Sequence, residues 1–247
     1  MRDMSKRKML AVFIGPQAVG KSYHAQMVFK TNIDSNTKST LVSLNYHALF
    51  HVKLTSIIDN VICKILNKCV LAKFYLNKPK TMLGSPQIYY AFLPLFCLIH
   101  LLAFIASEIR IFMCMLSNDL VIDQEGYAFK QIADLHYLAK YAGVSYESFM
   151  WKVLRKLYLL FLLNVMKKNL IIFHLELEYD ELIKRYINRG LIEPSYYINT
   201  QNLVYRAFLS IFKSYSIRQI SIYEVYTGGQ KEQISKLIIS KLNQLLL

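Results

Sequence analysis

The chain has 247 residues, enough to bury a sizeable core, and is expected to form one α/β domain with insertions rather than two small domains. Its formal net charge of +14 and pI near 9.5 favour anionic partners such as nucleotides, nucleic acid or acidic lipid. The basic residues are spread along the chain, which argues against a basic tail and fits a generally basic surface equally well.

The cysteines and the N-terminal segment indicate the cellular compartment in which the protein is expected. Four cysteines lie outside any C-x-x-C spacing and have no companion histidine pattern, so reduced, buried thiols of a cytoplasmic protein are expected: Cys63, Cys69, Cys97 and Cys114. His47 and His51 are one helical turn apart but lack an acidic or thiol partner, which argues against a metal site there. The apolar run that follows the basic N-terminus is too short for a secretory signal and is expected to enter a strand.

Strands and helices are predicted to alternate along the chain. Apolar runs bounded by turn residues predict five strands, at residues 8–15, 39–45, 119–123, 169–177 and 218–226. Helical spacing predicts the segments between them, at residues 21–31, about 55–117 with a break at 84–86, 146–168, 178–190, about 200–215 and 230–246. The helix at 146–168 is expected to be buried over much of its circumference, and Gly190 is expected to cap the helix at 178–190. This order predicts a parallel sheet with helices on both faces, in a single domain over residues 1–247.

An apolar stretch tests this interpretation. Residues 81–107 contain no Asp, Glu, Lys or Arg, and residues 88–107 are long enough to cross a bilayer. Three alternatives are open: a buried helix or helical hairpin, a surface that docks on a membrane or partner, and a true span. The buried helix is favoured, because a single span would separate the two halves of the site described below. Pro94 suggests two helical pieces joined by a kink, and His100 needs a polar partner.

A glycine loop follows the first predicted strand. Residues 15–22 read G-x-x-x-x-G-K-S, the Walker A pattern, in which backbone N–H groups and a helix N-terminus surround phosphate. The residues predicted to bind the nucleotide are Gly15, Pro16, Gln17, Ala18, Val19, Gly20, Lys21, Ser22 and Tyr23. Gly15 and Gly20 allow the tight curvature, Lys21 can bridge terminal phosphates, and the Ser22 hydroxyl can ligate Mg²⁺.

Two acids follow the third predicted strand. Asp123 ends that strand at the sheet edge shared with the glycine loop, so its carboxylate can reach a magnesium shell directly or through water. Glu125 can position or deprotonate an acceptor hydroxyl. The alternative is that Asp123 caps the next helix and Glu125 is an ordinary turn residue.

Basic residues follow the fourth predicted strand. Arg185 and Arg189 are four residues apart on one helical face, as expected of side chains that close over a transferring phosphoryl group. Lys184 and Arg206 are further candidates. The alternative is a solvated basic helix end. After the second strand, a separate set is placed where polar walls of an acceptor pocket would lie: Asn45, Tyr46 and His47.

These motifs together resemble the P-loop nucleoside-monophosphate-kinase-like group, nearest its thymidylate-kinase-like branch. The resemblance lies in four segments, "IGPQAVGKSY", "LVIDQEG", "IIFHLELEYDELIKRYINRG" and "ISIYEVYTGGQKEQISKLIISKL". It implies a three-layer α/β/α sandwich with a five-stranded parallel sheet in order 2-3-1-4-5, a helical insertion at about 55–117 and a lid at about 185–200. It also implies Mg²⁺ and ATP, with Lys21 and Ser22 at the phosphates. Gln124 stands where thymidylate kinases usually carry arginine, which leaves the acceptor open.

The expected function is therefore a Mg²⁺- and ATP-dependent kinase that phosphorylates a nucleoside monophosphate or another small metabolite. The alternative is a P-loop NTPase acting as a switch or interaction protein, with a peripheral membrane or protein contact through residues 86–107. Specific nucleic-acid binding is not expected, because no recognition motif is present. A preference for ATP over GTP and the oligomeric state, a dimer included, are left open by the sequence.

Overall fold

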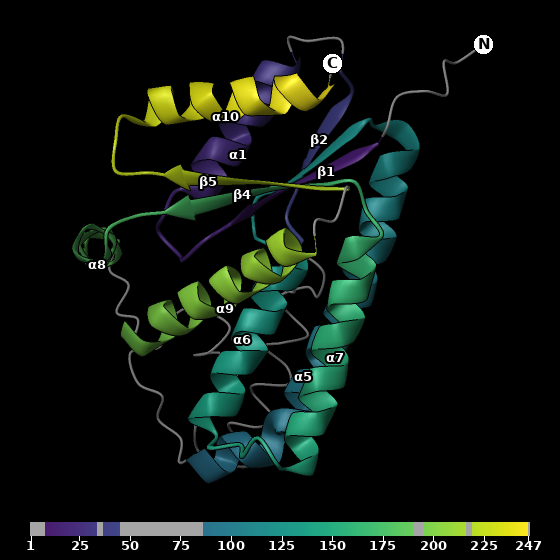
Figure 1. Cartoon of the computed structure of the whole chain (residues 1–247), viewed down its shortest axis with the longest axis vertical. Coiled ribbons are helices and arrows are strands. Elements are labelled where there is room, and N and C mark those ends of the chain that lie inside the picture. Colours follow the sequence, from purple (N-terminus) through teal and green to yellow (C-terminus); the bar gives the residue numbers. More distant parts are fainter. Residues whose placement is uncertain (1–7, 34–36, 45–85, 190–194, 216–218, 247) are drawn as a thin grey trace.

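The computed structural model describes residues 8–33, 37–44, 86–189, 195–215 and 219–246. Figure 1 shows a central sheet between two helical layers, with α1 and α10 on one face and α5, α6, α7 and α9 on the other. The strands are β1 (Met9–Ile14), β2 (Ser39–Val42), β3 (Leu120–Asp123), β4 (Leu170–Glu176) and β5 (Ile220–Tyr226). The helices are α1 (Lys21–Ile33), α5 (Pro86–Ser117), α6 (Tyr127–Tyr141), α7 (Phe149–Met166), α8 (Tyr179–Asn188), α9 (Ser195–Ser214) and α10 (Lys231–Leu246).

The five strands form one parallel sheet in the order β2-β3-β1-β4-β5, which confirms the predicted α/β fold and strand order. β1 is the central strand and pairs with β3 on one side and β4 on the other. Val12 lies opposite Asp123, and Ile14 lies opposite His174. The carboxyl ends of β1, β3 and β4 therefore meet at one edge of the sheet, where ligands of open α/β folds bind.

The β1 side chains alternate between two apolar cores. Leu10, Val12 and Ile14 face the core shared with α5, α6, α7 and α9, whereas Ala11 and Phe13 face the core shared with α1 and α10. All five are completely buried. A strand covered on both faces is a nearly continuous apolar run instead of an alternating one, and the sequence of β1, MLAVFI, has that character.

The long apolar segment forms α5, which lies beside α6 and α7. It is one continuous helix with Pro94 inside it, so the two pieces predicted from that proline are parts of one element. One face, including Phe96, Phe104 and Ile111, is buried in the core. Among the described residues, α5 is the one helix that is long and apolar enough to cross a membrane by length and composition, and 39% of its most apolar window is buried.

Three other elements differ from the prediction. No element was predicted at α6, which is buried on nearly all sides. α7 was expected to be buried over much of its circumference, and this is wrong: only Leu154, Phe161 and Val165 are buried. α8 ends at Asn188 with Arg189 as its C-cap. Gly190, residues 55–85 of the predicted insertion and residues 190–194 of the predicted lid lie outside the described residues.

Candidate functional site

The glycine loop, residues 15–20, connects β1 to α1 in a conformation that requires glycine at its first position. Gly15 has φ 141°, and a Cβ atom there would lie 2.4 Å from the carbonyl oxygen of Leu175 on β4. Gly20 has φ 110° and Ala18 has φ 61°, so left-handed residues recur along the loop. Such a backbone can turn successive N–H groups inward and make a concave anion site at the start of a helix.

Lys21 lies across this loop. Its ammonium donates to the carbonyl oxygens of Gly15 at 2.7 Å and Pro16 at 2.8 Å. The neighbouring Ser22 is exposed at the first turn of α1. A close-fitting glycine, a cation over the loop and an open hydroxyl fit the phosphates of a nucleotide and one ligand of Mg²⁺.

The next two residues of α1 contact α10 instead. Tyr23 donates to the carboxylate of Glu232 at 3.3 Å, so its predicted nucleotide contact stays a prediction. His24, which was not among the predicted site residues, is buried with its Nδ1 2.9 Å from the Ser235 hydroxyl. Burial and the nearby charges of Lys231 and Arg185 lower the pKa of His24 to about 4. The neutral imidazole of His24 therefore links α1, the helix that follows the glycine loop, to α10.

Asp123, at the end of β3, is completely buried, and both carboxylate oxygens accept backbone hydrogen bonds. One oxygen accepts from the N–H groups of Leu44 at 3.0 Å and Glu125 at 3.3 Å, and the other accepts from that of Gly126 at 2.8 Å. Burial raises the pKa of Asp123 to about 7, although these donors favour the carboxylate. These contacts hold the turn between β3 and α6, whose N-cap residue is Gly126, so the capping and magnesium roles of Asp123 both stay predictions.

The turn after Asp123 carries the other two polar residues of the motif. Glu125 is half-buried on the side of the sheet that α6 and α9 cover. Its negative charge contributes to the raised pKa of the Tyr205 hydroxyl on α9. The Oε1 atom of Gln124 is buried and accepts no hydrogen bond from any described residue. A buried acceptor at this place offers a bonding position to a ligand donor.

The two predicted lid arginines lie differently. Arg185 donates to the carboxylate of Glu181 and to the carbonyl oxygen of Thr227, both at 3.3 Å, which places it near the start of α10 and His24. Arg189 is exposed at the end of α8. Arg185 is therefore held toward the phosphate-loop side of the sheet, while Arg189 is an exposed residue at the C-cap of α8.

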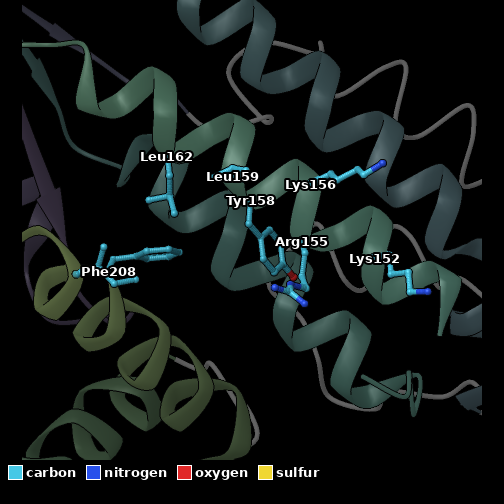
Figure 2. A pocket seen from close by; sticks show the side chains of 8 residues that line it. Lys152, Arg155, Lys156, Tyr158, Leu159, Leu162 and Phe208 are labelled. Atoms are coloured by element: carbon cyan, nitrogen blue, oxygen red, sulfur yellow. The ribbon is translucent and has the colours of Figure 1, made fainter. Parts of the chain in front are cut away.

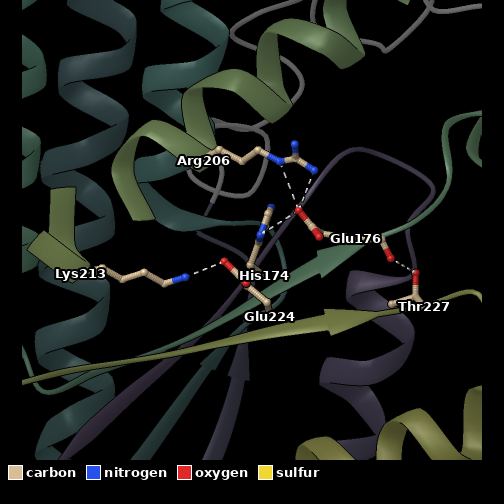
Figure 3. A network of polar contacts seen from close by, with 6 residues as sticks. All are labelled: His174, Glu176, Arg206, Lys213, Glu224 and Thr227. Carbon is tan, nitrogen blue, oxygen red and sulfur yellow. Dashed lines mark hydrogen bonds and ion pairs between the residues drawn. The ribbon is translucent and has the colours of Figure 1, made fainter. Parts of the chain in front are cut away.

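A polar network occupies the carboxyl ends of β4 and β5 (Figure 3). Arg206 of α9, the weaker arginine candidate, donates to the Glu176 carboxylate at 3.1 Å, and Nδ1 of the buried His174 lies 3.6 Å from the same oxygen. Lys213 donates to Glu224 at 2.8 Å. Burial lowers the pKa of His174 and outweighs the nearby carboxylates. This network links α9 to the strand end beside Gly15.

Buried polar groups also lie between α5, α6 and α9. Lys130 and Asp134 form an ion pair at 2.7 Å, and Asp134 is almost fully buried. The negative charge of Asp134 acts on two neighbours, raising the pKa of Tyr205 of α9 and opposing the lowering of the pKa of His100 of α5. Burial has the larger effect on His100 and lowers its pKa to about 4. The side-chain amide of Gln131 has no hydrogen-bond partner among the described residues. The sequence signal for this group was a cluster of polar residues in the apolar segment that follows Asp123.

A separate groove of about 680 Å³ lies between α7 and α9 (Figure 2). Its lining includes the apolar Leu159, Leu162 and Phe208 and the basic Lys152 and Arg155. None of its lining residues belongs to the predicted site. The phosphate loop and this groove are distinct features of the fold.

Metal ligands supplied by the protein alone are few. Within the described parts of the chain, no group of three or more His, Cys, Asp or Glu side chains could hold a metal ion. Mg²⁺ commonly binds proteins through one or two side chains plus substrate phosphates and water, which is compatible with Ser22 as the protein ligand. Three residues proposed from the sequence for the acceptor pocket, and the His51 that was argued not to bind metal, lie outside the described residues: Asn45, Tyr46, His47 and His51.

The chain is similar in fold to solved structures of deoxyadenosine kinase from M. mycoides. The structure with bound dCTP superposes with a TM-score of 0.56 at 13% identity, and one with bound dATP superposes with a TM-score of 0.54 at 15% identity. Each alignment covers 96% of this chain and 100% of the other. No protein-family model matches the chain, and no curated protein matches it in sequence. The likeness shows a P-loop kinase-like fold, and the thymidylate-kinase-like branch stays a prediction.

Proposed function

We propose that this chain is a Mg²⁺- and ATP-dependent kinase that phosphorylates a nucleoside or nucleoside monophosphate. The observation that carries the proposal is the glycine loop at the carboxyl edge of the sheet, where Gly15 lies against Leu175 of β4 and Lys21 spans the loop. The fold shared with deoxyadenosine kinases supports the reaction class.

The donor nucleotide is assigned to the loop side of this edge. Its phosphates would accept hydrogen bonds from the N–H groups of residues 15–20 and from Lys21, whose ammonium would exchange the two carbonyl oxygens for phosphate oxygens. Ser22 would hold Mg²⁺, which when bound draws negative charge from the phosphates. Arg185 would exchange its contacts with Glu181 and the Thr227 carbonyl for a contact with the same charge.

The acceptor is assigned to the side of the sheet covered by α5, α6 and α9. The unpartnered Gln124 Oε1 and Gln131 amide can read the edge of a base, and Glu125 can accept the proton of an attacking hydroxyl. Because deoxyadenosine kinases share this fold, we propose nucleosides as acceptors in addition to the nucleoside monophosphates expected from the sequence.

The test is ADP formation by the full chain with Mg²⁺ and ATP, in the presence of a panel of nucleosides and nucleoside monophosphates. At least one acceptor is expected to raise the rate well above that with water alone. Lys21→Ala is expected to lower this rate at least about 100-fold, because it removes a charged donor from the transferring phosphates. Lys30→Ala, an exposed lysine on the same helix, is the matched control. Equal rates for the Lys21 variant and the unmodified chain would refute the proposal.

The same assay distinguishes the second candidate, a P-loop NTPase that acts as a switch. Gln124 favours it, because a neutral glutamine supplies no cation to an acceptor phosphate at the position where thymidylate kinases usually carry arginine. ADP formation at one rate with and without every acceptor would support this candidate and exclude the kinase.

A further inference from the structure

The groove between α7 and α9, here called the α7–α9 groove, has two chemically different ends. Three cations line it in the first part of α7: Lys152, Arg155 and Lys156. Four apolar residues line it further along: Leu159 and Leu162 of α7, and Phe208 and Ile211 of α9. Along α7 the distance from Lys152 to Leu162 is about 15 Å, and Figure 2 shows Lys152 and Phe208 far apart in the view. The groove therefore runs from a cationic end to an apolar end.

The three cations of the groove have no partner within the described part of the chain. Lys152, Arg155 and Lys156 are three and four residues apart, so they share one face of α7, and all three are exposed. None forms an ion pair or hydrogen bond with a described residue, and the groove lining contains no acidic side chain. Like charges this close on a helix repel one another. An anion bound between them would relieve this repulsion.

Tyr158 adds a hydrogen-bonding group to the same lining. Its hydroxyl oxygen is buried and has no hydrogen-bond partner among the described residues. The ring packs against Trp151 and against His136 of α6, each with ring centroids 6.4 Å apart, which holds the side chain in place. Arg155 lies three residues earlier on the same helix face. The hydroxyl therefore offers a bonding position to a ligand that also reaches the cations.

We propose that the α7–α9 groove binds a single-chain lipid phosphate, which is a function separate from the kinase site. The phosphate monoester would lie at the cationic end, and the hydrocarbon chain would lie against Leu159, Leu162 and Phe208. Such a head group carries a charge of about −1.5 to −2 near neutral pH and several acceptor oxygens, which suits three cations and a hydroxyl donor. The volume of about 680 Å³ is typical of a small-molecule site.

Two other anionic partners fit the groove less well. A nucleotide would place its base and ribose at the apolar end, where Leu159, Leu162, Phe208 and Ile211 offer no side-chain partner to their polar groups. An acidic amphipathic helix would meet cations along the length of a groove, whereas the cations here are gathered at one end. A hydrocarbon chain needs no polar partner, so the separation of charge from apolar surface favours the lipid phosphate.

The test uses Trp151, which is the single tryptophan of the chain and lies next to Lys152 and against Tyr158. The full chain is titrated with dodecyl phosphate below its micelle concentration, and the tryptophan fluorescence is expected to change saturably. Dodecyl maltoside, which has the same chain on a neutral head, and inorganic phosphate, which lacks a chain, are each expected to bind at least about 10-fold more weakly. Far-UV circular dichroism checks that the ligand leaves the protein folded.

Surface variants identify the groove as the binding site. K152Q/R155Q is expected to weaken binding of dodecyl phosphate at least about 10-fold, because it removes two charged donors. K30Q/K236Q loses the same charge from exposed positions of α1 and α10, in the opposite helical layer, and should bind as the unmodified chain does. Tyr158→Phe keeps the ring and removes only the hydroxyl, so it should weaken binding by about 10-fold.

Competition with ATP on the unmodified chain needs no variant and distinguishes the groove from the glycine loop. Excess ATP is expected to leave dodecyl phosphate bound, and its displacement would place the phosphate in the loop and overturn the proposal. The proposal would also be overturned by absence of saturable binding, or by equal affinities of K152Q/R155Q and K30Q/K236Q. Binding to phosphatidate vesicles without binding to monomeric dodecyl phosphate would make the groove part of a membrane surface and would exclude a single-chain ligand.

Discussion

Gly15→Ala tests the geometry of the phosphate loop, and Gly143→Ala supplies the control. Gly143 follows the end of α6, with φ 68° and no atom within 4 Å of the place that a Cβ atom would take. Alanine there would therefore destabilise the fold only because an L-residue disfavours this backbone conformation. That cost is about 1–2 kcal/mol for an L-residue in the left-handed region. The hydrogen bonds from the N–H groups of Gly143 to Lys140 and of Val144 to Ala139 complete this helix end.

Alanine at position 15 would incur at least the same backbone cost and a collision in addition. Its Cβ atom would lie 2.4 Å from the Leu175 carbonyl oxygen, which belongs to a central strand and cannot rotate away. Overpacking of this kind costs about 1–3 kcal/mol, so the free energy of unfolding should fall by about 2–5 kcal/mol. Relief of the clash would also move the loop, so nucleotide binding should be lost in Gly15→Ala and kept in Gly143→Ala.

Urea unfolding of both variants measures the difference. With an m-value of about 2 kcal/mol per M, the midpoint should fall by about 1–2.5 M for Gly15→Ala and by about 0.5–1 M for Gly143→Ala. Binding of a non-hydrolysable ATP analogue, followed by thermal shift, provides the functional measurement. The reasoning would be refuted if the two variants lost equal stability, or if Gly15→Ala bound the analogue as the unmodified chain does.

Two further predictions concern titration and the arginine of α8. The pKa of Asp123 is raised to about 7 in the folded chain, so its contribution to stability is complete below about pH 4 and is lost as pH rises through about 7. Urea midpoints of Asp123→Asn across this range should lack that decline, and an identical pH dependence would contradict the raised pKa. Arg185→Ala should reduce kcat about 100-fold while costing less than about 1 kcal/mol of stability, since its contacts are partly exposed. Lys140→Ala, an exposed lysine in the last turn of α6, should leave both quantities unchanged, and equal kcat values for the two variants would remove Arg185 from the site.

The sequence predicted the sheet and the glycine loop because both depend on local patterns. Apolar runs such as residues 9–14 identify strands, and the spacing of Gly15, Gly20 and Lys21 has few alternative uses. α6 was missed because it is buried on nearly all sides, so it lacks the one-sided apolar pattern of a surface helix. α7 was misjudged for the opposite reason: Leu159, Leu160 and Leu163 are apolar but exposed, which composition alone cannot distinguish.

The candidate site was only partly readable from the sequence, because its contacts join distant segments. The placement of Asp123 at a strand end followed from the pattern, but its bonds to Leu44 and Gly126 depend on how β2 and the next turn approach it. The ion pair of Arg206 with Glu176 and the closeness of Leu175 to Gly15 likewise arise from packing between elements. Such contacts depend on tertiary structure, which a motif does not encode.

The central position of β1 affects how the chain is synthesised and folds. β1 leaves the ribosome before its partners β3 and β4, which begin about 110 and 160 residues later; this corresponds to roughly 5–30 seconds at ordinary translation rates. During that time the segment MLAVFI, apolar on both faces, lacks both strands with which it pairs in the folded sheet. Parallel pairing over such sequence separations is slow, so refolding is expected to be slow and this segment vulnerable to aggregation. The strand that positions the phosphate loop is thus the one whose burial depends most on the rest of the chain being made.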